Sequence, residues 1–283
     1  MALIPKFFID CVVAIGVEIN GSKNWIGTGF LFGYLFEKTT DSRNKYFTYL
    51  VTNKHVINNY EKIFVKFNPQ TDQSSKDYDI VLKMADGSNN WTGHPDANID
   101  IAVIPVDIQI LIDEGMKFHF FQSDKHVLTS TDMAREGLSE GDFIYVLGFP
   151  MGILTSDRQY VFSRSGTISR ISDLYEKRSK DFIIDAFVFP GNSGGPVLSK
   201  PEIVSIKGTK GYSHSKLIGI IKSYIPYTDI AYSLQTQKPR ITFEENTGLT
   251  IVEPIEHVIE TIIEEDKRKD VAQQLLKSNG AKM

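Results

Sequence analysis

Short runs of β-branched and aromatic residues, each ended by turn residues, dominate this sequence from about Phe8 to Thr250. They include GTGFLFGYLF, YFTYLVTN, KIFVKF, DIAVIPV, DFIYVLGFP, DFIIDAFV, SIKGT and KLIGIIKSYI. Many short strands separated by turns are typical of all-β sandwiches and barrels, whereas parallel sheets alternate strands with helical segments. We therefore predict an all-β fold over this part of the chain.

The succession of strands is broken between Asp107 and Glu140, where the sequence is more polar and contains the helix-like stretch STDMAREGLSEGD. We expect a boundary between two β halves within it, near residues 124–139. The boundary separates an N-terminal half, about residues 8–123, from a C-terminal half, about residues 140–250. A chain of 283 residues is long enough for one large domain or for two packed halves.

The last segment, residues 251–283, has the pattern of a helix. Pro254 suits the first turn of a helix, and Gly280 suits the position just after its end. Between them, apolar residues recur at helical spacing: Ile255, Val258, Ile259, Ile262, Ile263, Val271, Leu275 and Leu276. We expect this helix to dock on the β halves, and binding to a regulatory protein partner is the alternative.

Charge and cysteine content argue against several classes of function. The net charge of −4 at pH 7 gives no electrostatic reason to expect nucleic acid or an anionic membrane as a partner. No run reaches the roughly 18 apolar residues of a membrane span. Asp10 interrupts the apolar N-terminal stretch, which favours a first strand over a targeting segment. The single cysteine, Cys11, excludes internal disulfide bonds and favours a reducing, cytoplasmic location.

The most informative motif is FPGNSGGPV, with Ser193 at its centre. Gly191, Gly194 and Gly195 allow backbone angles that other residues resist, so the stretch can form a tight turn that presents the serine hydroxyl. The amides of such a turn can converge on one point, as acyl-transfer chemistry requires for an oxyanion. By itself, the string could also be a simple glycine-rich turn.

Two further residues favour a catalytic interpretation: His55 in YLVTNKHVI and Asp100 in NIDIAVIPV, each beside an apolar, strand-like run. A histidine, then an acid, then a serine is one of the chain orders in which a Ser-His-Asp triad occurs. It differs from the order of the α/β-hydrolases, so an esterase of that type is disfavoured. Taken alone, His55 would fit a structural role and Asp100 a turn or a cap. Asp96 is a second candidate for the acid.

Seven segments, in order, resemble the trypsin-like (chymotrypsin-fold) serine peptidases, and most of all the bacterial branch of high-temperature-requirement proteases. These segments are GTGFLF, VTNKHVI, DIAVIPV, GDFIYVLGFPMG, SRSGTISRIS, DAFVFPGNSGGPVL and LIGIIKSY. The resemblance implies two packed six-stranded antiparallel β-barrels, followed by the C-terminal helix. It implies no cofactor. We expect no counterpart of the PDZ module that usually follows in that branch.

The resemblance also implies roles for individual residues. Ser193 would be the nucleophile, His55 the general base, and Asp100 the acid that orients the histidine. Gly191, Asn192 and Ser193 would form the oxyanion hole. Asn192 stands where the digestive trypsins have an aspartate that pairs with a newly cut N-terminus. Activation by such a cleavage is therefore not expected, whereas control by a partner or by loop ordering is.

The same resemblance places a substrate pocket at five residues: Phe187 at its base, with Val188, Lys222, Ser223 and Tyr224 on its walls. No acid lies at the base, which argues against a preference for arginine or lysine. Phe187 would either fill the pocket and leave a shallow apolar site, or point into the core. Lys222 stands where the family has a serine that supports the aspartate, which changes the electrostatics expected around that acid.

We therefore predict a cytoplasmic serine endopeptidase that hydrolyses protein or peptide substrates through an acyl-enzyme. Control by a partner or by loop ordering, in a bacterial stress or defence system, is part of this prediction. The alternative is a catalytically silent or latent module of the same fold that acts as a protein-binding regulatory platform. The remaining histidines show no metal-ligand spacing and the chain has a single thiol, so no metal site is expected.

Overall fold

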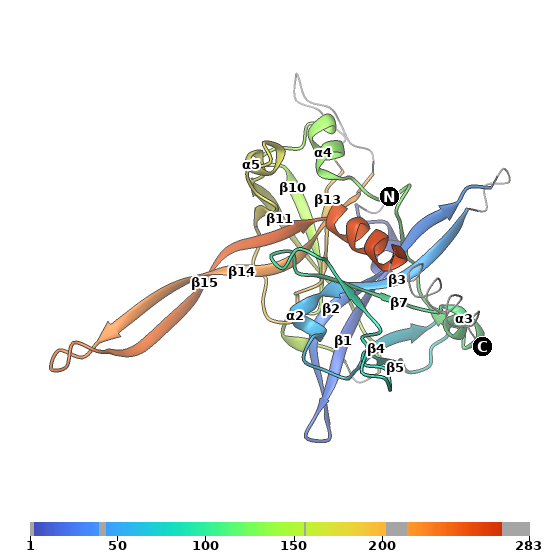
Figure 1. Cartoon of the computed structure of the whole chain (residues 1–283), viewed down its shortest axis with the longest axis horizontal. Helices are drawn as coiled ribbons and strands as arrows, with labels where there is room; N and C mark the ends of the chain where they lie inside the picture. The colour runs from blue at the N-terminus through green and yellow to red at the C-terminus, as the bar shows by residue number, and fades with distance from the viewer. Residues whose placement is uncertain (1–2, 40–43, 156, 202–213, 268–283) are drawn as a thin grey trace, which may run out of the picture.

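The strands form two β units joined by a segment that contains a short helix (Figure 1). The computed structural model describes residues 3–39, 44–155, 157–201 and 214–267. Within these ranges the chain is mainly β-strand, which confirms the predicted all-β class. The expected strand SIKGT, at residues 205–209, and residues 268–283 of the expected helix lie outside the described part of the chain.

The first unit is a nine-stranded sheet among the described residues, with the strand order β5-β4-β1-β2-β3-β7-β6. β8 pairs with β4, and β9 pairs with β2 in parallel. This differs from the expected six-stranded barrel, because the two-residue strands β6, β8 and β9 add to it from the connecting segments. The strands are β1 (Val12–Ile19), β2 (Ser22–Glu37), β3 (Lys45–Asn53), β4 (Lys62–Pro69), β5 (Lys76–Val81), β6 (Thr92–Gly93), β7 (Ile101–Pro105), β8 (Met116–Lys117) and β9 (Phe121–Gln122).

The second unit is a closed barrel with the order β10-β11-β12-β15-β14-β13, and every neighbouring pair is antiparallel. It agrees with the six-stranded barrel expected for the C-terminal half. Buried side chains such as Ile144, Ile168 and Ile184 fill its core. The strands are β10 (Phe143–Gly148), β11 (Phe162–Arg170), β12 (Phe182–Asp185), β13 (Pro196–Ser199), β14 (Leu217–Tyr232) and β15 (Pro239–Pro254).

Several short helices lie between the strands. α4 falls inside the predicted boundary at residues 124–139 and is capped at both ends. Thr129 and Asp132 form a capping box at its start, and Gly137 ends it with a φ of 85°. The short helices are α1 (Lys6–Ile9), α2 (Lys54–Ile57), α3 (Gln109–Asp113), α4 (Ser130–Glu136), α5 (Ser172–Tyr175) and the 3₁₀ helix η1 (Pro150–Gly152).

A long hairpin of β14 and β15 projects from the barrel, drawn in orange in Figure 1. Beyond Tyr224 the two strands leave the barrel, and most of their side chains are exposed. The base of the hairpin lies beside the predicted nucleophile, because the Gly194 amide donates to the carbonyl of Ile221 at 3.0 Å. The hairpin therefore begins at the candidate site and extends away from it.

A terminal helix over residues 256–267 ties the two units together. Ile255, Val258 and Ile262 are fully buried in an apolar core that includes residues of both units. The helix begins at residue 256 rather than 251, because β15 continues to Pro254. Over the described range it docks on the rest of the molecule. None of the helices in the described part of the chain is long and apolar enough to cross a membrane.

Candidate active site

The pairing of β3 with β7 brings His55 and Asp100 together. His55 lies in α2, directly after β3, and Asp100 directly precedes β7. The two strands are antiparallel, with Asn53 opposite Ile101. This register sets the end of one strand beside the start of the other. Two side chains that are 45 residues apart in the chain are therefore in contact.

The carboxylate of Asp100 holds the His55 ring in one orientation. Its Oδ2 is hydrogen-bonded to His55 Nδ1, and its Oδ1 accepts from the His55 amide at 3.1 Å. An ionised carboxylate only accepts, so Nδ1 carries the proton and Nε2 keeps its lone pair. The His55 side chain is 49% exposed and that of Asp100 is 19% exposed. The ring therefore faces solvent with the acid behind it, as a general base requires.

Asp96, the second candidate for the acid, lies in different surroundings. It is ion-paired with Lys180, and its Oδ1 accepts from the Asn98 amide at 2.9 Å. These two contacts lower the pKa of Asp96 to about 2. Its hydrogen bonds hold the loop before β7, and Asp100 is the acid that is bonded to His55.

Ser193 lies in the loop between β12 and β13, which two glycines shape. Gly191 and Gly194 have φ angles of 97° and 83°, in the left-handed region that other residues rarely adopt. Space is also missing at Gly194, where a Cβ would overlap the carbonyl oxygen of Thr28 and the hydroxyl of Thr52. Gly194 is therefore required both by its backbone angle and by its close approach to the first unit.

Two amides of this loop are free of protein acceptors. The carbonyl of Pro190 accepts from Met151 N at 2.6 Å, and that of Asn192 accepts from the amide three residues further on at 2.9 Å. The C=O and N–H of a trans peptide point in opposite directions. The N–H groups of Gly191 and Ser193 therefore point the other way, and no acceptor in the described ranges takes either of them. Free amide donors beside a serine hydroxyl are what an oxyanion hole needs.

Asn192, the third residue assigned to the oxyanion hole, has its side chain turned inward. It is only 2% exposed, and a Cβ placed on Gly148 would lie 3.1 Å from its Oδ1. Its Nδ2 has no hydrogen-bond partner among the residues that the structure describes. Its own amide donates to the carbonyl of Phe189 at 2.9 Å, so the part that remains for Asn192 is to shape the backbone of the loop.

Thr28, on β2, joins the first unit to the serine loop, and the sequence analysis did not single it out. Its hydroxyl donates to the carbonyl of Gly191 at 2.6 Å and accepts from the amide of Phe149 at 3.0 Å. Its amide donates to the carbonyl of Ser193 at 2.9 Å, and its carbonyl accepts from the Thr52 hydroxyl at 2.8 Å. The available signal was a polar residue between two glycines in an otherwise apolar strand, GTGFLF.

Ser193 is close to the acid–base pair but is not hydrogen-bonded to it. Its neighbour Gly194 contacts Thr52, which is three residues before His55 in the chain. The Ser193 hydroxyl donates to the carbonyl of Lys222 at 3.5 Å. No hydrogen bond between Ser193 and His55 is present within the described ranges. The structure therefore pairs His55 with Asp100 and leaves the hydroxyl of Ser193 turned towards β14.

The five residues predicted to form a substrate pocket have different surroundings. Phe187 is 52% exposed, so it does not point into the core, and Val188 is buried in the barrel core. The side chain of Lys222 reaches a buried carboxylate behind the site. Ser223 is exposed, and Tyr224 packs against the core. The pocket assignment stays a prediction.

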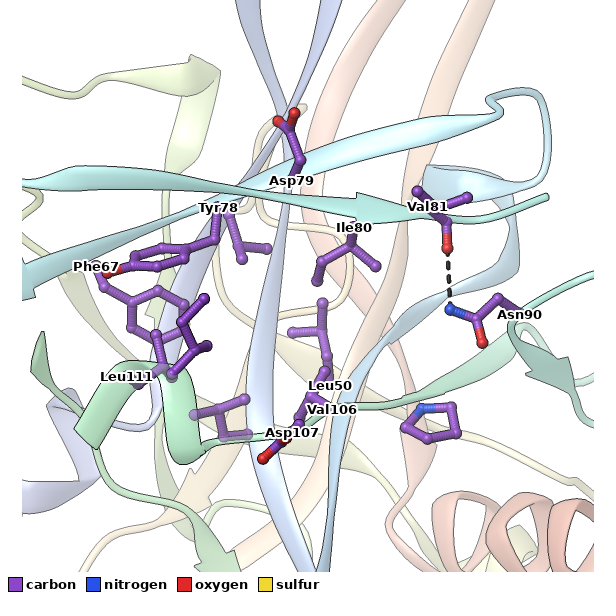
Figure 2. A pocket seen from close by; sticks show the side chains of 14 residues that line it. Leu50, Phe67, Tyr78, Asp79, Ile80, Val81, Asn90, Val106, Asp107 and Leu111 are labelled. Atoms are coloured by element: carbon purple, nitrogen blue, oxygen red, sulfur yellow. Dashed lines mark hydrogen bonds between the residues drawn. The ribbon is translucent and has the colours of Figure 1, made fainter. Parts of the chain in front are cut away.

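A separate cavity of about 270 Å³ lies on the first unit (Figure 2). Figure 2 shows Phe67, Tyr78 and Leu111 together on one side of it. Across the cavity, Asn90 Nδ2 donates to the carbonyl of Val81 at 3.0 Å. None of the predicted site residues lines this cavity, so it is distinct from the candidate active site.

A two-unit β protein with a His–Asp pair beside a glycine-rich serine loop has the parts of a serine peptidase. A family model described as a trypsin-like peptidase domain matches residues 27–202, more than half of the chain. The chain belongs to the trypsin-like peptidase family. Among solved structures it is similar to the Drosophila Grass clip serine protease of the Toll pathway, with 10% identity and a TM-score of 0.47. That match covers 92% of this chain and 70% of the Grass chain.

Proposed function

We propose that the protein is a serine endopeptidase that hydrolyses peptide bonds through an acyl-enzyme. One observation carries the proposal: the His55 ring is bonded to Asp100 through Nδ1, which leaves Nε2 available near a serine loop in which two amides meet no acceptor in the described part of the chain. Membership of the trypsin-like peptidase family supports protein or peptide substrates. Residues 27–202 include all three predicted catalytic residues.

In the proposed reaction, Ser193 Oγ attacks the carbonyl carbon of the scissile bond while His55 Nε2 takes its proton. The developing oxyanion accepts hydrogen bonds from the amides of Gly191 and Ser193. Asp100 stabilises the imidazolium, which then gives the proton to the leaving amine. The same ring deprotonates a water molecule, which attacks the acyl-enzyme and releases the acid product.

A second candidate function is a latent module that becomes active, or acts as a binding platform, only with a partner. The observation that favours it is the hydroxyl of Ser193, which donates to Lys222 O rather than to His55. A serine side chain changes rotamer on a picosecond to nanosecond scale when it is free to do so. Ordering of the loop or binding of a partner would then act by holding the rotamer that meets Nε2.

Several finer features are proposed from the sequence alone. They are the relation to the high-temperature-requirement branch, a cytoplasmic location, and a role in bacterial stress or defence. Cys11 is buried and free, as expected in a reducing compartment. The division into halves at about residues 8–123 and 140–250 with a helix at 251–283 is a proposal of the same kind.

The proposed activity is tested by incubating the purified chain with a peptide library, with and without cell extract. We expect cleavage by the wild-type protein and none by the Ser193→Ala variant. Ser163→Ala is the matched control, because Ser163 is an exposed serine on β11 of the same barrel. Cleavage only when extract is present would favour the latent form. An equal cleavage pattern from wild type and Ser193→Ala would contradict the proposed function.

A further inference from the structure

A buried carboxylate that the proposed mechanism does not use lies directly behind the acid of the site. Glu253, near the end of β15, is fully buried. Its Oε1 accepts from the amide of Asp100 at 3.0 Å and from Lys222 Nζ at 2.8 Å, and its Oε2 is bonded to His257 Nδ1 at 2.8 Å. Removal of an unpaired carboxylate from water costs several kcal/mol. Hydrogen bonds and an ion pair with partners from three segments offset this cost for Glu253. These segments are the loop before β7, β14 and the terminal helix.

Glu253 is an anion at neutral pH. Burial by itself would raise its pKa, but hydrogen bonds from His257, from Lys222 and from the Asp100 amide outweigh burial and lower the pKa. A second negative charge this close to Asp100 would repel its carboxylate if nothing neutralised it. Lys222 supplies the neutralising cation, and the carbonyl of Asn98 holds its ammonium at 2.8 Å.

The contact with Glu253 completes the fixation of the Asp100 backbone. The carbonyl of Asp100 accepts from Asn53 Nδ2 at 2.8 Å and from Lys54 N at 3.2 Å. Its amide donates to Glu253 at 3.0 Å. Both polar groups of this backbone are therefore held, which fixes the direction in which the side chain leaves towards His55. Small displacements of catalytic groups are costly, because about 1 Å can reduce the rate of reaction by 10²-fold.

Lys222 also links this support to the nucleophile. Its ammonium contacts Glu253 behind Asp100, while its carbonyl accepts from the Ser193 hydroxyl. The position carries a serine in the family that the sequence resembles. Here a longer, charged side chain reaches a carboxylate on the neighbouring strand.

We propose that Glu253 is a positioning residue that holds the backbone of Asp100, and that Lys222 is the cation that allows a second carboxylate to lie behind the acid. The inference rests on the proposed function, since it assigns Asp100 as the acid of the triad. It adds a support for the acid that includes the terminal helix, through His257.

The test compares Glu253→Gln with the matched control Glu265→Gln. Glu265 is also a buried carboxylate and lies on the terminal helix, where it accepts from the Thr92 hydroxyl, whereas the amide of Asp100 donates to Glu253. The first measurement is the low-field proton NMR signal of His55 Nδ1–H, assigned by its loss in His55→Ala. This signal reports the His55–Asp100 bond whether or not the protein cleaves peptides. The second is kcat and KM on a peptide found in the library screen.

We expect Glu253→Gln to shift or broaden the His55 signal and to lower kcat by about 10–100-fold with KM nearly unchanged. Glu265→Gln should leave the signal and kcat unchanged. An unchanged signal in folded Glu253→Gln would overturn the proposal. A changed signal in a protein that cleaves no peptide would support the positioning role and contradict the proposed function, so the two failures are distinguishable.

A second variant covers the case in which Glu253→Gln does not fold. Lys222→Met keeps the aliphatic stem and the backbone carbonyl but removes the cation that neutralises Glu253. It should also change the His55 signal, because Glu253 then lies next to Asp100 without the cation that neutralises it. A signal identical to that of the wild type in folded Lys222→Met would overturn the assignment of Lys222.

Discussion

The two β units contribute to the candidate site in different ways. In the first unit, His55 and Asp100 are already hydrogen-bonded to each other, and both belong to the β3–β7 region. The second unit carries Ser193 on a loop in which the amides of Gly191 and Ser193 meet no acceptor within the described ranges, and the Ser193 hydroxyl bonds to its own barrel, at Lys222. The His55–Asp100 bond thus forms within the first unit, although Glu253 of the second unit holds the Asp100 amide, whereas the place of Ser193 beside this pair depends on contacts between the units.

Several of the contacts between the units lie at the serine loop itself. Thr28 bonds to Gly191, Phe149 and Ser193 across the junction, and Gly194 packs against the first unit. We therefore expect that changes to the His55–Asp100 pair remove the chemistry and leave the fold intact. Changes at the junction should affect both stability and reactivity.

The largest effect is expected from Asp100→Asn in the first unit. The amide would present a donor to His55 Nδ1 and favour the wrong tautomer of the ring, with a loss of about 10³–10⁴-fold in kcat. The thermal unfolding temperature should change little. A loss of less than tenfold, measured on the same peptide and with the same folded fraction, would show that the acid–base pair is not what sets the rate.

A large loss of stability is expected from Gly194→Ala at the junction. The backbone strain at a φ of 83° and the overlap with Thr28 and Thr52 should together cost about 3 kcal/mol of unfolding free energy. Gly21→Ala is the control, because Gly21 has a φ of 74° but open space around it. It should lose only about 1 kcal/mol. Equal losses in urea titrations would mean that the close approach at Gly194 contributes nothing.

A smaller and mixed effect is expected from Thr28→Val. The variant leaves the carbonyl of Gly191 and the amide of Phe149 without their partner, which costs about 2 kcal/mol in a buried site. Peptide cleavage should also slow, because Gly191 carries a proposed oxyanion donor. Thr261→Val removes a buried hydroxyl of the terminal helix that bonds to His257 O. Thr261→Val should lower the unfolding free energy without slowing peptide cleavage. If it slowed cleavage as much as Thr28→Val does, the slower cleavage could not be assigned to the contact between Thr28 and Gly191.

The smallest effect concerns the segment that connects the units. Burial, together with Lys216 and Lys125, lowers the pKa of His126 to about 4. The ring is therefore neutral in the folded protein and gains a proton more readily when unfolded, where its pKa is about 6.5. The contribution of the neutral His126 ring to the unfolding free energy is fully present above pH 6.5, and the unfolding free energy should fall by about 1–2 kcal/mol as the pH drops to 4.

The pH effect is measured by urea unfolding of the wild type and His126→Gln at pH 7.5 and pH 4.5. The difference in unfolding free energy between the two proteins should shrink at the lower pH. Other acidic groups titrate equally in both proteins and cancel in this difference. A constant difference across the two pH values would show that His126 is not the group responsible.

The strand pattern was enough to predict the all-β class, whereas the C-terminal barrel and the pairing of Asp100 with His55 were predicted from the resemblance of seven ordered segments to the trypsin-like serine peptidases. Periodicity and turn residues are local signals, and each short strand is determined mainly by the residues within it. The long β14–β15 hairpin was not predicted, because both its faces are exposed and it needs no alternation of apolar and polar residues.

The supports of the site could not be predicted for a different reason. Thr28 and Glu253 act through partners far away in the chain: Gly191 for Thr28, and Asp100 with Lys222 for Glu253. A lone threonine in a strand, or a lone glutamate at the end of one, carries no spacing pattern. Only the folded arrangement shows that they hold the acid and the serine loop.

The most direct test of the central claim is to treat the protein with a fluorophosphonate and locate the adduct by mass spectrometry. The account predicts one adduct on Ser193, none in Ser193→Ala, and much slower formation in His55→Ala. Ser163→Ala should react like the wild type. An adduct on another residue, or no adduct with any peptide or extract added, would contradict the claim that Ser193 is an activated nucleophile.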